Sequence, residues 1–246
     1  MLGLVLGGSL GGAYLLRQLW LQLPATDHLA DYDPMLPMRI HARDGTLLAE
    51  YGEERRDVVA IEHMPRQLRE ALLAIEDANF YAHGGVDFAG LARAALSNFR
   101  SGGHVQGGST ITMQVARVFF LNRVKTYRRK PKEVRLAYKL ESAYSKDKLL
   151  ELYMNQIYLG ERAYGFAAAA SVYFDKTLDQ LTAAESAMLA GLPKAPSAYN
   201  PVANRERAVA RQRHILQRMH ALGHLEAEQL EQALSEELKL RPRGNS

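Results

Sequence analysis

Apolar residues recur at three- and four-residue spacing along most of the chain, a pattern typical of amphipathic helices. The first such segment follows Pro65 and ends at Glu76. Thr182 and Glu185 have the spacing of a capping box, and Gly223 is typical of the residue just after a helix. The pattern predicts a mainly α protein, with further helices over residues 87–99, 110–121, 132–144, 146–158, 161–173, 182–191, 204–221 and 226–238.

A short β region is predicted ahead of these helices. Apolar runs over residues 38–42 and 46–51 flank Asp44 and Gly45, which is the pattern of a β-hairpin. Residues 57–61 are expected to add a third extended segment to it. The expected organisation is therefore a membrane anchor over residues 1–23, a linker with a small β region over 24–62, the main domain over 63–238 and a tail over 239–246.

The anchor is predicted because the first 23 residues carry a single charged residue, Arg17. As a helix they would reach about 35 Å, enough for a hydrocarbon core of about 30 Å. Arg17 and Trp20 suit the membrane interface. The alternative is a cleaved leader or signal segment, and either interpretation implies that the body of the protein is exported.

Composition narrows the possible classes of protein. At 47% hydrophobic and 24% charged residues, the 246-residue chain is neither disordered nor collagen-like. It has no Cys, which excludes a disulfide scaffold and thiolate chemistry. The net charge of +4 is uneven: residues 117–148 carry a local charge of +8, and the rest of the chain carries −4. An anionic partner is therefore expected at the middle of the chain.

Two motifs suggest a site. Glu76 and Asp77 end an apolar helix, where a partly buried carboxylate can act as a general base, although acids at a helix end are often merely solvated. The glycine-rich segment 100–108, an expected mobile loop, leads into Ser109 and Thr110 at the start of a helix. Such a start attracts phosphate or carboxylate, or is a plain N-cap.

Two further motifs follow. The cationic run over residues 128–132 closes on Glu133, near a helix that Pro131 can begin; it suits a departing phosphate, a solvated face or anionic lipid. Asn155 lies within an amphipathic helix and is expected to be hydrogen-bonded rather than reactive. Six His residues lack the spacing of a metal motif and are expected at the surface; they are His41, His63, His104, His214, His220 and His224.

In their order and spacing the motifs resemble one family, the peptidoglycan glycosyltransferase domain (glycosyltransferase family 51) of class A penicillin-binding proteins. The resemblance runs from about residue 39 to 238. Its motifs are Glu-Asp-x-x-Phe-x-x-His-x-Gly at 76–85, Gly-Gly-Ser-Thr-Ile-Thr-x-Gln at 107–114, Arg-Lys-x-x-Glu at 129–133, Leu-x-x-Tyr-x-Asn-x-x-Tyr-x-Gly at 150–160, and residues 190–201.

The resemblance implies a mainly α, lysozyme-like glycosyltransferase domain with head and jaw lobes. Its cleft would bind lipid II as acceptor and the growing lipid-linked glycan chain as donor, in bacterial cell-wall synthesis. Glu76 would be the general base at the acceptor 4-hydroxyl, and Glu133 would assist at the donor. The remaining positions that the resemblance assigns to substrate binding or to the wall around Glu76 are Asp77, Phe80, His83, Gly108, Ser109, Thr110, Gln114, Arg117, Arg129, Lys130 and Asn155.

The chemistry of the leaving group agrees with this expectation. A glycosidase needs a general acid, whereas a pyrophosphate leaves as a stable anion that cations or a divalent metal can stabilise. A divalent cation, Mg or Mn, is therefore expected at the pyrophosphate, without an organic cofactor. The alternatives are a lysozyme-like hydrolase or lytic transglycosylase, a non-catalytic membrane-surface or nucleic-acid module, and a degenerate scaffold; the predicted anchor disfavours nucleic acid.

The resemblance also implies a place in the cell. The expected location is the cytoplasmic (inner) membrane, crossed once, with the catalytic domain on the periplasmic or extracellular side. Expected partners are the membrane and other cell-wall synthesis proteins. Residues 162–170 and 191–196 look more like the bifunctional members of the family, so we expect an excised anchor-plus-transferase piece, without a transpeptidase domain, rather than a monofunctional enzyme.

Overall fold

The computed structural model describes residues 24, 26, 29, 34, 36–45, 47–52, 54–101, 108–121 and 129–241. The predicted anchor over residues 1–23 lies outside these residues, as do Arg128 and most of the predicted mobile loop. Within the described residues, every helix is too short or too polar to cross a membrane.

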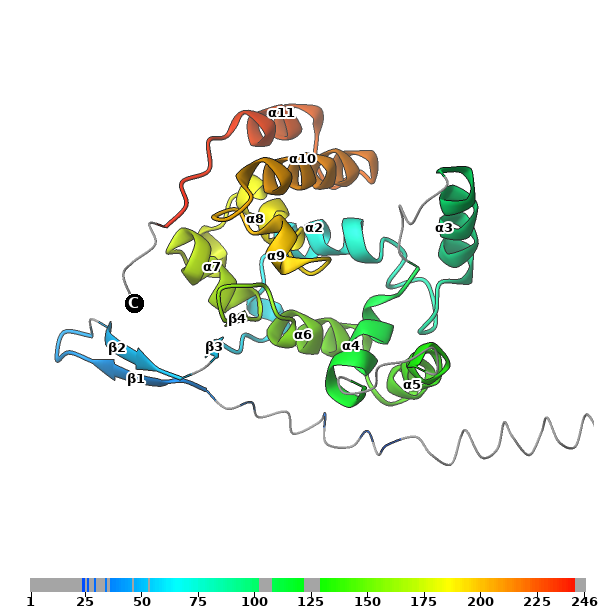
Figure 1. Cartoon of the computed structure of the whole chain (residues 1–246), viewed down its shortest axis with the longest axis horizontal. Coiled ribbons are helices and arrows are strands. Elements are labelled where there is room, and N and C mark those ends of the chain that lie inside the picture. The colour runs from blue at the N-terminus through cyan, green and yellow to red at the C-terminus, as the bar shows by residue number, and fades with distance from the viewer. Residues whose placement is uncertain are drawn as a thin grey trace, which may run out of the picture.

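The described chain is mainly helical, as predicted (Figure 1). Two 3-10 turns, η2 (Ile61–His63) and η3 (Leu178–Gln180), join the longer elements. The helices are α2 (Arg66–Glu76), α3 (Phe88–Ser101), α4 (Ile111–Phe120), α5 (Arg129–Ala143), α6 (Lys146–Gln156), α7 (Phe166–Phe174), α8 (Ala183–Ala190), α9 (Pro196–Tyr199), α10 (Arg205–Ala221) and α11 (Ala227–Ser235). The strands are β1 (Met38–His41), β2 (Leu47–Tyr51), β3 (Arg55–Arg56) and β4 (Ala163–Tyr164).

Helix α2 lies at the centre of the core, in contact with α8 and α10 (Figure 1). Its predicted apolar face is buried, with Leu68, Ala71 and Leu72 at 0% exposure. Burial of each leucine contributes about 1.5–3 kcal/mol of hydrophobic stabilisation. Helix α4 packs against α5 and α6, which lie on the side of α2 away from α10 (Figure 1). The C-terminal end of α2 and the start of α4 are thus fixed by separate packing contacts.

The predicted hairpin is confirmed. Strands β1 and β2 pair antiparallel, with Met38 opposite Tyr51, and the turn contains Gly45 at φ +87°, a value that favours glycine. The expected third segment over residues 57–61 does not join it, which corrects the prediction. The side chain of Asn155 instead takes up both backbone groups of Val59, at 3.0 Å from its N and 2.8 Å from its O.

The helix predicted over residues 161–173 begins only at Phe166. Gly165 has φ +83°, and a Cβ there would lie 2.7 Å from the Asn155 carbonyl oxygen. Tyr164 belongs instead to β4, which pairs with β3 in a parallel two-stranded sheet. A left-handed glycine at a close backbone approach therefore separates this strand from the alanine-rich helix.

The other helix bounds agree with the predictions to within a few residues. Helix α5 begins at Arg129 and so includes Pro131 in its first turn, where the missing N–H breaks no helical hydrogen bond. The capping box of Thr182 and Glu185 is present at α8, and Gly223 follows the end of α10 at φ +77°. Helix α11 ends at Ser235, three residues before its predicted end.

Candidate active site

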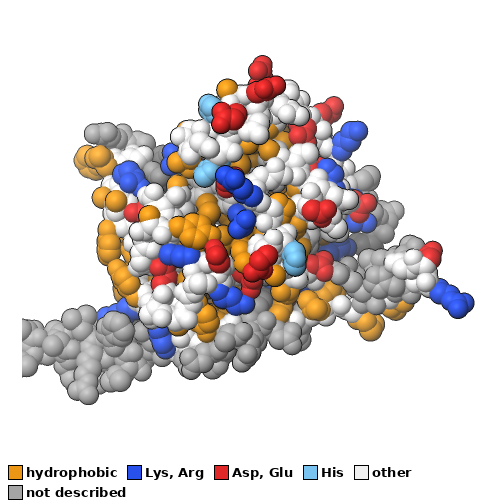
Figure 2. Space-filling model, turned by 180° about the vertical axis from the view of Figure 1, so that it is seen from behind, with side chains coloured by type: hydrophobic (Ala, Val, Ile, Leu, Met, Phe, Trp, Pro, Cys, Tyr) orange, Lys and Arg blue, Asp and Glu red, His pale blue; other side chains and the backbone are white. Residues whose placement is uncertain are grey.

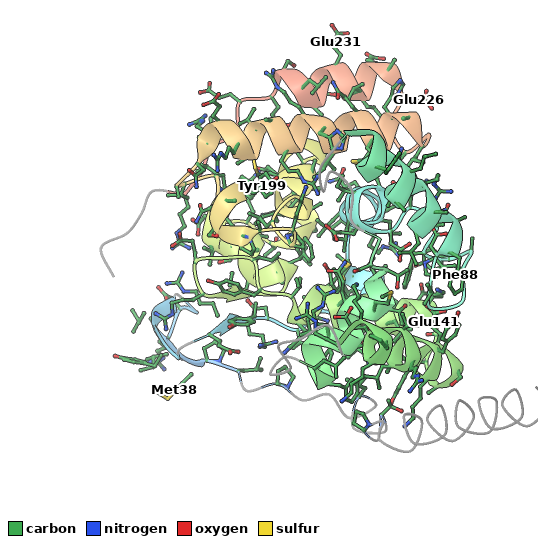
Figure 3. The ribbon with its side chains drawn as sticks, turned by 45° about the vertical axis from the view of Figure 1, so that its right-hand side comes forward. Met38, Phe88, Glu141, Tyr199, Glu226 and Glu231 are labelled. Carbon is green, nitrogen blue, oxygen red and sulfur yellow. The ribbon has the colours of Figure 1, made fainter. Side chains whose placement is uncertain are left out.

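A cavity of about 550 Å³ lies where the end of α2 meets the start of α4. Acidic and basic side chains gather near the middle of the face shown in Figure 2. The predicted residues that line the cavity are Glu76, Asp77, Gly108, Ser109, Thr110, Gln114 and Arg117. Asp87, Leu91 and Arg93 also line it, from the start of α3 and the residue just before it, while the exposed Phe88 of α3 lies at the outer edge of the molecule (Figure 3).

Glu76 is oriented by a chain of hydrogen bonds from two other helices. The Gln114 Nε2 donates to Glu76 Oε2 at 2.9 Å, and the Tyr153 hydroxyl donates to Gln114 Oε1 at 3.1 Å. Burial, and then the charge of Glu76, hold the pKa of Tyr153 well above its usual range, so Tyr153 stays a neutral donor. Oε1 of Glu76 makes no hydrogen bond to the described residues and is available to a substrate.

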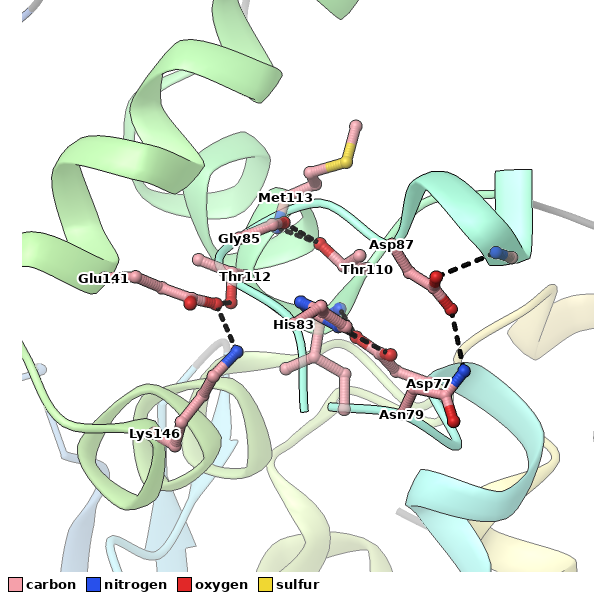
Figure 4. A network of polar contacts seen from close by, with 12 residues as sticks. Asp77, Asn79, His83, Gly85, Asp87, Thr110, Thr112, Met113, Glu141 and Lys146 are labelled. Atoms are coloured by element: carbon pink, nitrogen blue, oxygen red, sulfur yellow. Dashed lines mark hydrogen bonds and ion pairs between the residues drawn. The ribbon is translucent and has the colours of Figure 1, made fainter. Parts of the chain in front are cut away.

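Asp77 links the end of α2 to the start of α4 (Figure 4). Its Oδ2 accepts from the backbone N–H of Ile111 at 3.0 Å, and its carboxylate also binds Nε2 of His83 at 2.9 Å. Thr110 caps α4 by accepting from Met113 N, as the N-cap prediction states. The second acid of the pair therefore fixes the backbone beside Glu76 and is already occupied by these partners.

Glu133 is fully buried at 0% exposure and is surrounded by cations. Its carboxylate pairs with Arg117 Nε at 2.8 Å, Arg129 Nε at 2.9 Å and Lys130 Nζ at 3.0 Å. Burial raises the pKa of Glu133, but hydrogen bonds and charge from Arg117 and Lys130 outweigh burial, so the pKa lies below its ordinary value. Glu133 is therefore an anion that holds three cations together.

This cation cluster, defined as Arg117, Arg129 and Lys130, is joined to the cavity at two points. Arg117 lines the cavity itself. Lys130 donates a hydrogen bond to the hydroxyl of Ser109, which also lines it. With one buried carboxylate among three cations, the cluster keeps an excess of positive charge beside Ser109.

Three predicted site residues lie behind the cavity rather than in its wall. Phe80 is buried and packs edge-to-face on the ring of His83, with the ring centroids 6.2 Å apart. Asn155 is buried and bound to the backbone of Val59, as its prediction of a hydrogen-bonded residue states. The aromatic pair thus supports Asp77, and the amide fixes the segment that precedes η2.

Sequence reasoning missed the opposite wall of the cavity. It is formed by Lys194 and by Arg211, His214 and Arg218 of α10. Burial lowers the pKa of His214, and the charges of Arg211, Arg218 and Lys194 lower it further, so the imidazole is neutral at pH 7. The three- and four-residue spacing along α10 was a usable signal for a shared face, but it did not indicate that this face meets the cavity.

The described residues include no group of three or more His, Asp or Glu side chains placed to hold a metal ion. The carboxylate of Asp77 is bound by Ile111 and His83, and that of Asp87 by Gly90 N at 2.8 Å and Asn79 at 3.1 Å. The hydrogen bond from Gly90 is the main cause that lowers the pKa of Asp87. These residues do not fit a metal ion held by the protein alone.

The fold and the site together define a mainly helical protein with a carboxylate in a cation-lined cavity. Residues 44–220 match the transglycosylase family, and the chain belongs to that family. It is 54% identical over 217 residues to penicillin-binding protein 1A of Neisseria gonorrhoeae, covering 88% of this chain and 27% of that protein. It is 49% identical over 229 residues to penicillin-binding protein 1A of Escherichia coli, covering 93% and 27%.

A solved structure is similar as well. The crystal structure of penicillin-binding protein 1A from Haemophilus influenzae matches with a TM-score of 0.52 and 30% identity, over 85% of this chain and 22% of that one. The chain spans about a quarter of the length of the curated relatives it matches. These similarities confirm the resemblance inferred from the five motifs.

Proposed function

We propose that the protein is a peptidoglycan glycosyltransferase. It polymerises lipid II into β-1,4-linked glycan strands and releases undecaprenyl pyrophosphate. The observation that carries the proposal is the pairing, in one cavity, of an oriented carboxylate with a cation cluster. Glu76 is held by Gln114 at 2.9 Å, and the cluster reaches the cavity through Arg117 and Ser109.

Each part has a separate task in the proposed reaction. Glu76 accepts the proton of the acceptor 4-hydroxyl as that oxygen attacks the anomeric carbon of the donor. The bond from this carbon to the pyrophosphate breaks on the opposite face, so the configuration inverts. Arg117 and Lys130 stabilise the negative charge that develops on the departing pyrophosphate. Glu133 acts through these cations, since it holds them in place.

The state of Glu133 removes one candidate for the acid that the alternative, a lysozyme-like hydrolase or lytic transglycosylase, would need. A hydrolase of that kind needs a carboxylic acid that protonates the sugar leaving group. Glu133 is ionised, because three cations surround it and its pKa is lowered. A fixed anion among cations suits a reaction whose leaving group is itself an anion.

The same proposal includes the fold type, the location and the partners of the domain. The domain is of the lysozyme-like type with head and jaw lobes, and it acts on the periplasmic or extracellular side of the cytoplasmic (inner) membrane, which the chain crosses once. Its partners are the membrane, the growing lipid-linked glycan chain and other cell-wall synthesis proteins, and not nucleic acid. A divalent cation, Mg or Mn, stays a prediction; substrate phosphate oxygens would have to provide most of its ligands.

The proposal is tested by incubating the protein with labelled lipid II in detergent and separating the products on a gel. We expect a ladder of glycan polymers from the wild type and its loss in Glu76→Gln. Glu62→Gln is the matched control, because Glu62 lies exposed on η2 and does not line the cavity. Equal thermal unfolding of the variants shows that the loss comes from chemistry.

The opposite results would identify the alternatives. A folded wild-type protein that makes no ladder, with or without added Mg²⁺ or Mn²⁺, contradicts the proposed function. Release of soluble sugars from purified sacculi would then indicate a hydrolase or lytic transglycosylase, and no release would indicate a scaffold. A ladder that persists in Glu76→Gln would contradict the role of Glu76 as general base and would leave the proposed function standing.

A further inference from the structure

Helix α10 places a cationic face on the cavity wall opposite the cation cluster. The face is defined as Arg211, His214 and Arg218, and Lys194 lies beside it. We propose that this cationic face binds carboxylate groups of the peptide carried by the disaccharide of the substrate. The inference rests on the proposed function and assigns one part of the lipid-linked disaccharide-peptide to one wall of the cavity.

The charges on this wall lie close to one another. The positions three and seven residues after Arg211 fall on the same side of a helix, and all three residues line the cavity. After burial, the causes that lower the pKa of His214 are the charges of Arg211, Arg218 and Lys194. The imidazole of His214 thus lies within the electrostatic influence of three cations. In its neutral form it adds one hydrogen-bond donor and one acceptor to the wall.

The cationic face differs from the cation cluster in its counter-ion. The cluster surrounds Glu133, whereas Arg211, Arg218 and Lys194 form no direct ion pair with a carboxylate in the described part of the chain. The charge of Glu76 still acts on Arg211, where it partly offsets the lowering of the Arg211 pKa by burial. The guanidinium of Arg211 lies over the ring of Tyr199, 5.7 Å from its centroid. Repulsion among these cations is therefore relieved when an anionic ligand enters the cavity.

The position of the face distinguishes a peptide carboxylate from the lipid pyrophosphate. Just after the predicted anchor, the carbonyl of Pro24 accepts from Lys139 Nζ at 2.9 Å, and that of Thr26 accepts from the Tyr144 hydroxyl at 2.8 Å. Pro24 and Thr26, which follow the predicted anchor, therefore lie beside the end of α5. Helix α10 lies on the other side of α2 (Figures 1 and 3).

The substrate has two kinds of negative charge, and each is at a different distance from the lipid. The pyrophosphate is joined to the lipid, so it belongs on the α5 side with the cation cluster. The sugars are neutral, and the peptide attached to them ends in a carboxylate. A cationic wall away from the membrane therefore fits the peptide, bound through charge-assisted hydrogen bonds.

The test compares two lipid II substrates that differ only in the peptide, with its carboxylates either free or converted to amides. We expect the wild type to prefer the free acid, through a lower KM. In Arg218→Gln that preference should fall by about threefold to tenfold, as for one lost charge-assisted contact. Arg213→Gln is the matched control, since Arg213 is exposed on the same helix and does not line the cavity.

A second variant, Arg211→Gln, should reduce the preference in the same way, and the thermal unfolding of each variant is measured beside its kinetics. A wild type that uses both substrates equally well overturns the inference. So does an Arg218→Gln variant that loses activity equally on both, because its charge then acts on a part of the substrate other than the peptide. A wild type that polymerises neither substrate contradicts the proposed function itself.

Discussion

Replacing Glu133 by Gln removes the one negative charge at the centre of the cation cluster. The carboxylate is 0% exposed and is paired with Arg117, Arg129 and Lys130 at 2.8, 2.9 and 3.0 Å. Gln keeps the shape of the side chain, but its amide offers one acceptor oxygen in place of two. The variant therefore leaves cations that repel one another next to a buried amide.

The size of the effect depends on how deeply Glu133 and its three partner cations are buried. Removing one partner of a buried ion pair costs about 3–5 kcal/mol. Here the side chains of the three cations are 32%, 38% and 53% exposed, so water screens part of their charge. After this discount we expect Glu133→Gln to lower the free energy of unfolding by about 2–3 kcal/mol. The melting temperature should fall by roughly 5–10 °C.

The assay is unfolding by urea, followed by circular dichroism, for the wild type and Glu133→Gln at several pH values. The folded pKa of Glu133 is lowered from 4.5, so the carboxylate stabilises the fold fully above that pH. Its contribution is lost as the pH falls through the folded pKa. The difference between the two proteins should therefore be largest near pH 7 and shrink below about pH 4.5.

Glu231→Gln is the control for this comparison. Glu231 is exposed on the outer face of α11, so its replacement should change the free energy of unfolding by less than about 0.5 kcal/mol (Figure 3). A similarly small change in Glu133→Gln, or a difference that does not shrink in acid, would refute the reasoning. The cations would then be held by contacts other than the buried carboxylate.

Three further predictions concern the supports of the site. Tyr153→Phe removes the donor to Gln114 and should lower kcat several-fold at a stability cost of about 1 kcal/mol; an unchanged kcat would contradict this. Gly165→Ala should cost more than about 2 kcal/mol in thermal unfolding, since φ is +83° and its Cβ would lie 2.7 Å from the Asn155 carbonyl oxygen; wild-type stability would oppose it. Asp77→Asn should cost about 1–3 kcal/mol by urea unfolding, because it loses charged acceptors to two donors, and a neutral effect would contradict that.

Much of the helical fold could be predicted because one face of each helix is apolar. Leu68 and Leu72 of α2 show this, since their spacing places them on the buried face. The true start of the helix predicted over residues 161–173 could not be found in this way. Its alanine-rich pattern is compatible with a helix throughout, and only the tertiary approach of Gly165 to Asn155 requires the left-handed conformation.

The candidate site was predictable in part for a related reason. Glu76 and Gln114 belong to two motifs of one family, and the resemblance to that family assigned both residues to the same cleft. The cationic face on α10 could not be predicted, because Arg211 and Arg218 lie 97 and 104 residues after Gln114 and belong to none of the five motifs. In sequence they resemble any solvated basic helix, and only the packing of α10 against α2 brings them to the cavity.

The bond between Asp77 and the N–H of Ile111 has a consequence for how the protein can change over time. It joins residues 34 positions apart and closes the intervening chain into a loop anchored at both ends. Lengthening a closed loop adds little entropy cost, about 0.6 kcal/mol for each doubling. Insertions or deletions in the part of α3 beyond Arg93, the last residue of this helix that lines the cavity, can therefore alter the helix while Glu76 and Ser109 keep their positions. The length of this helix can thus evolve separately from the reacting groups.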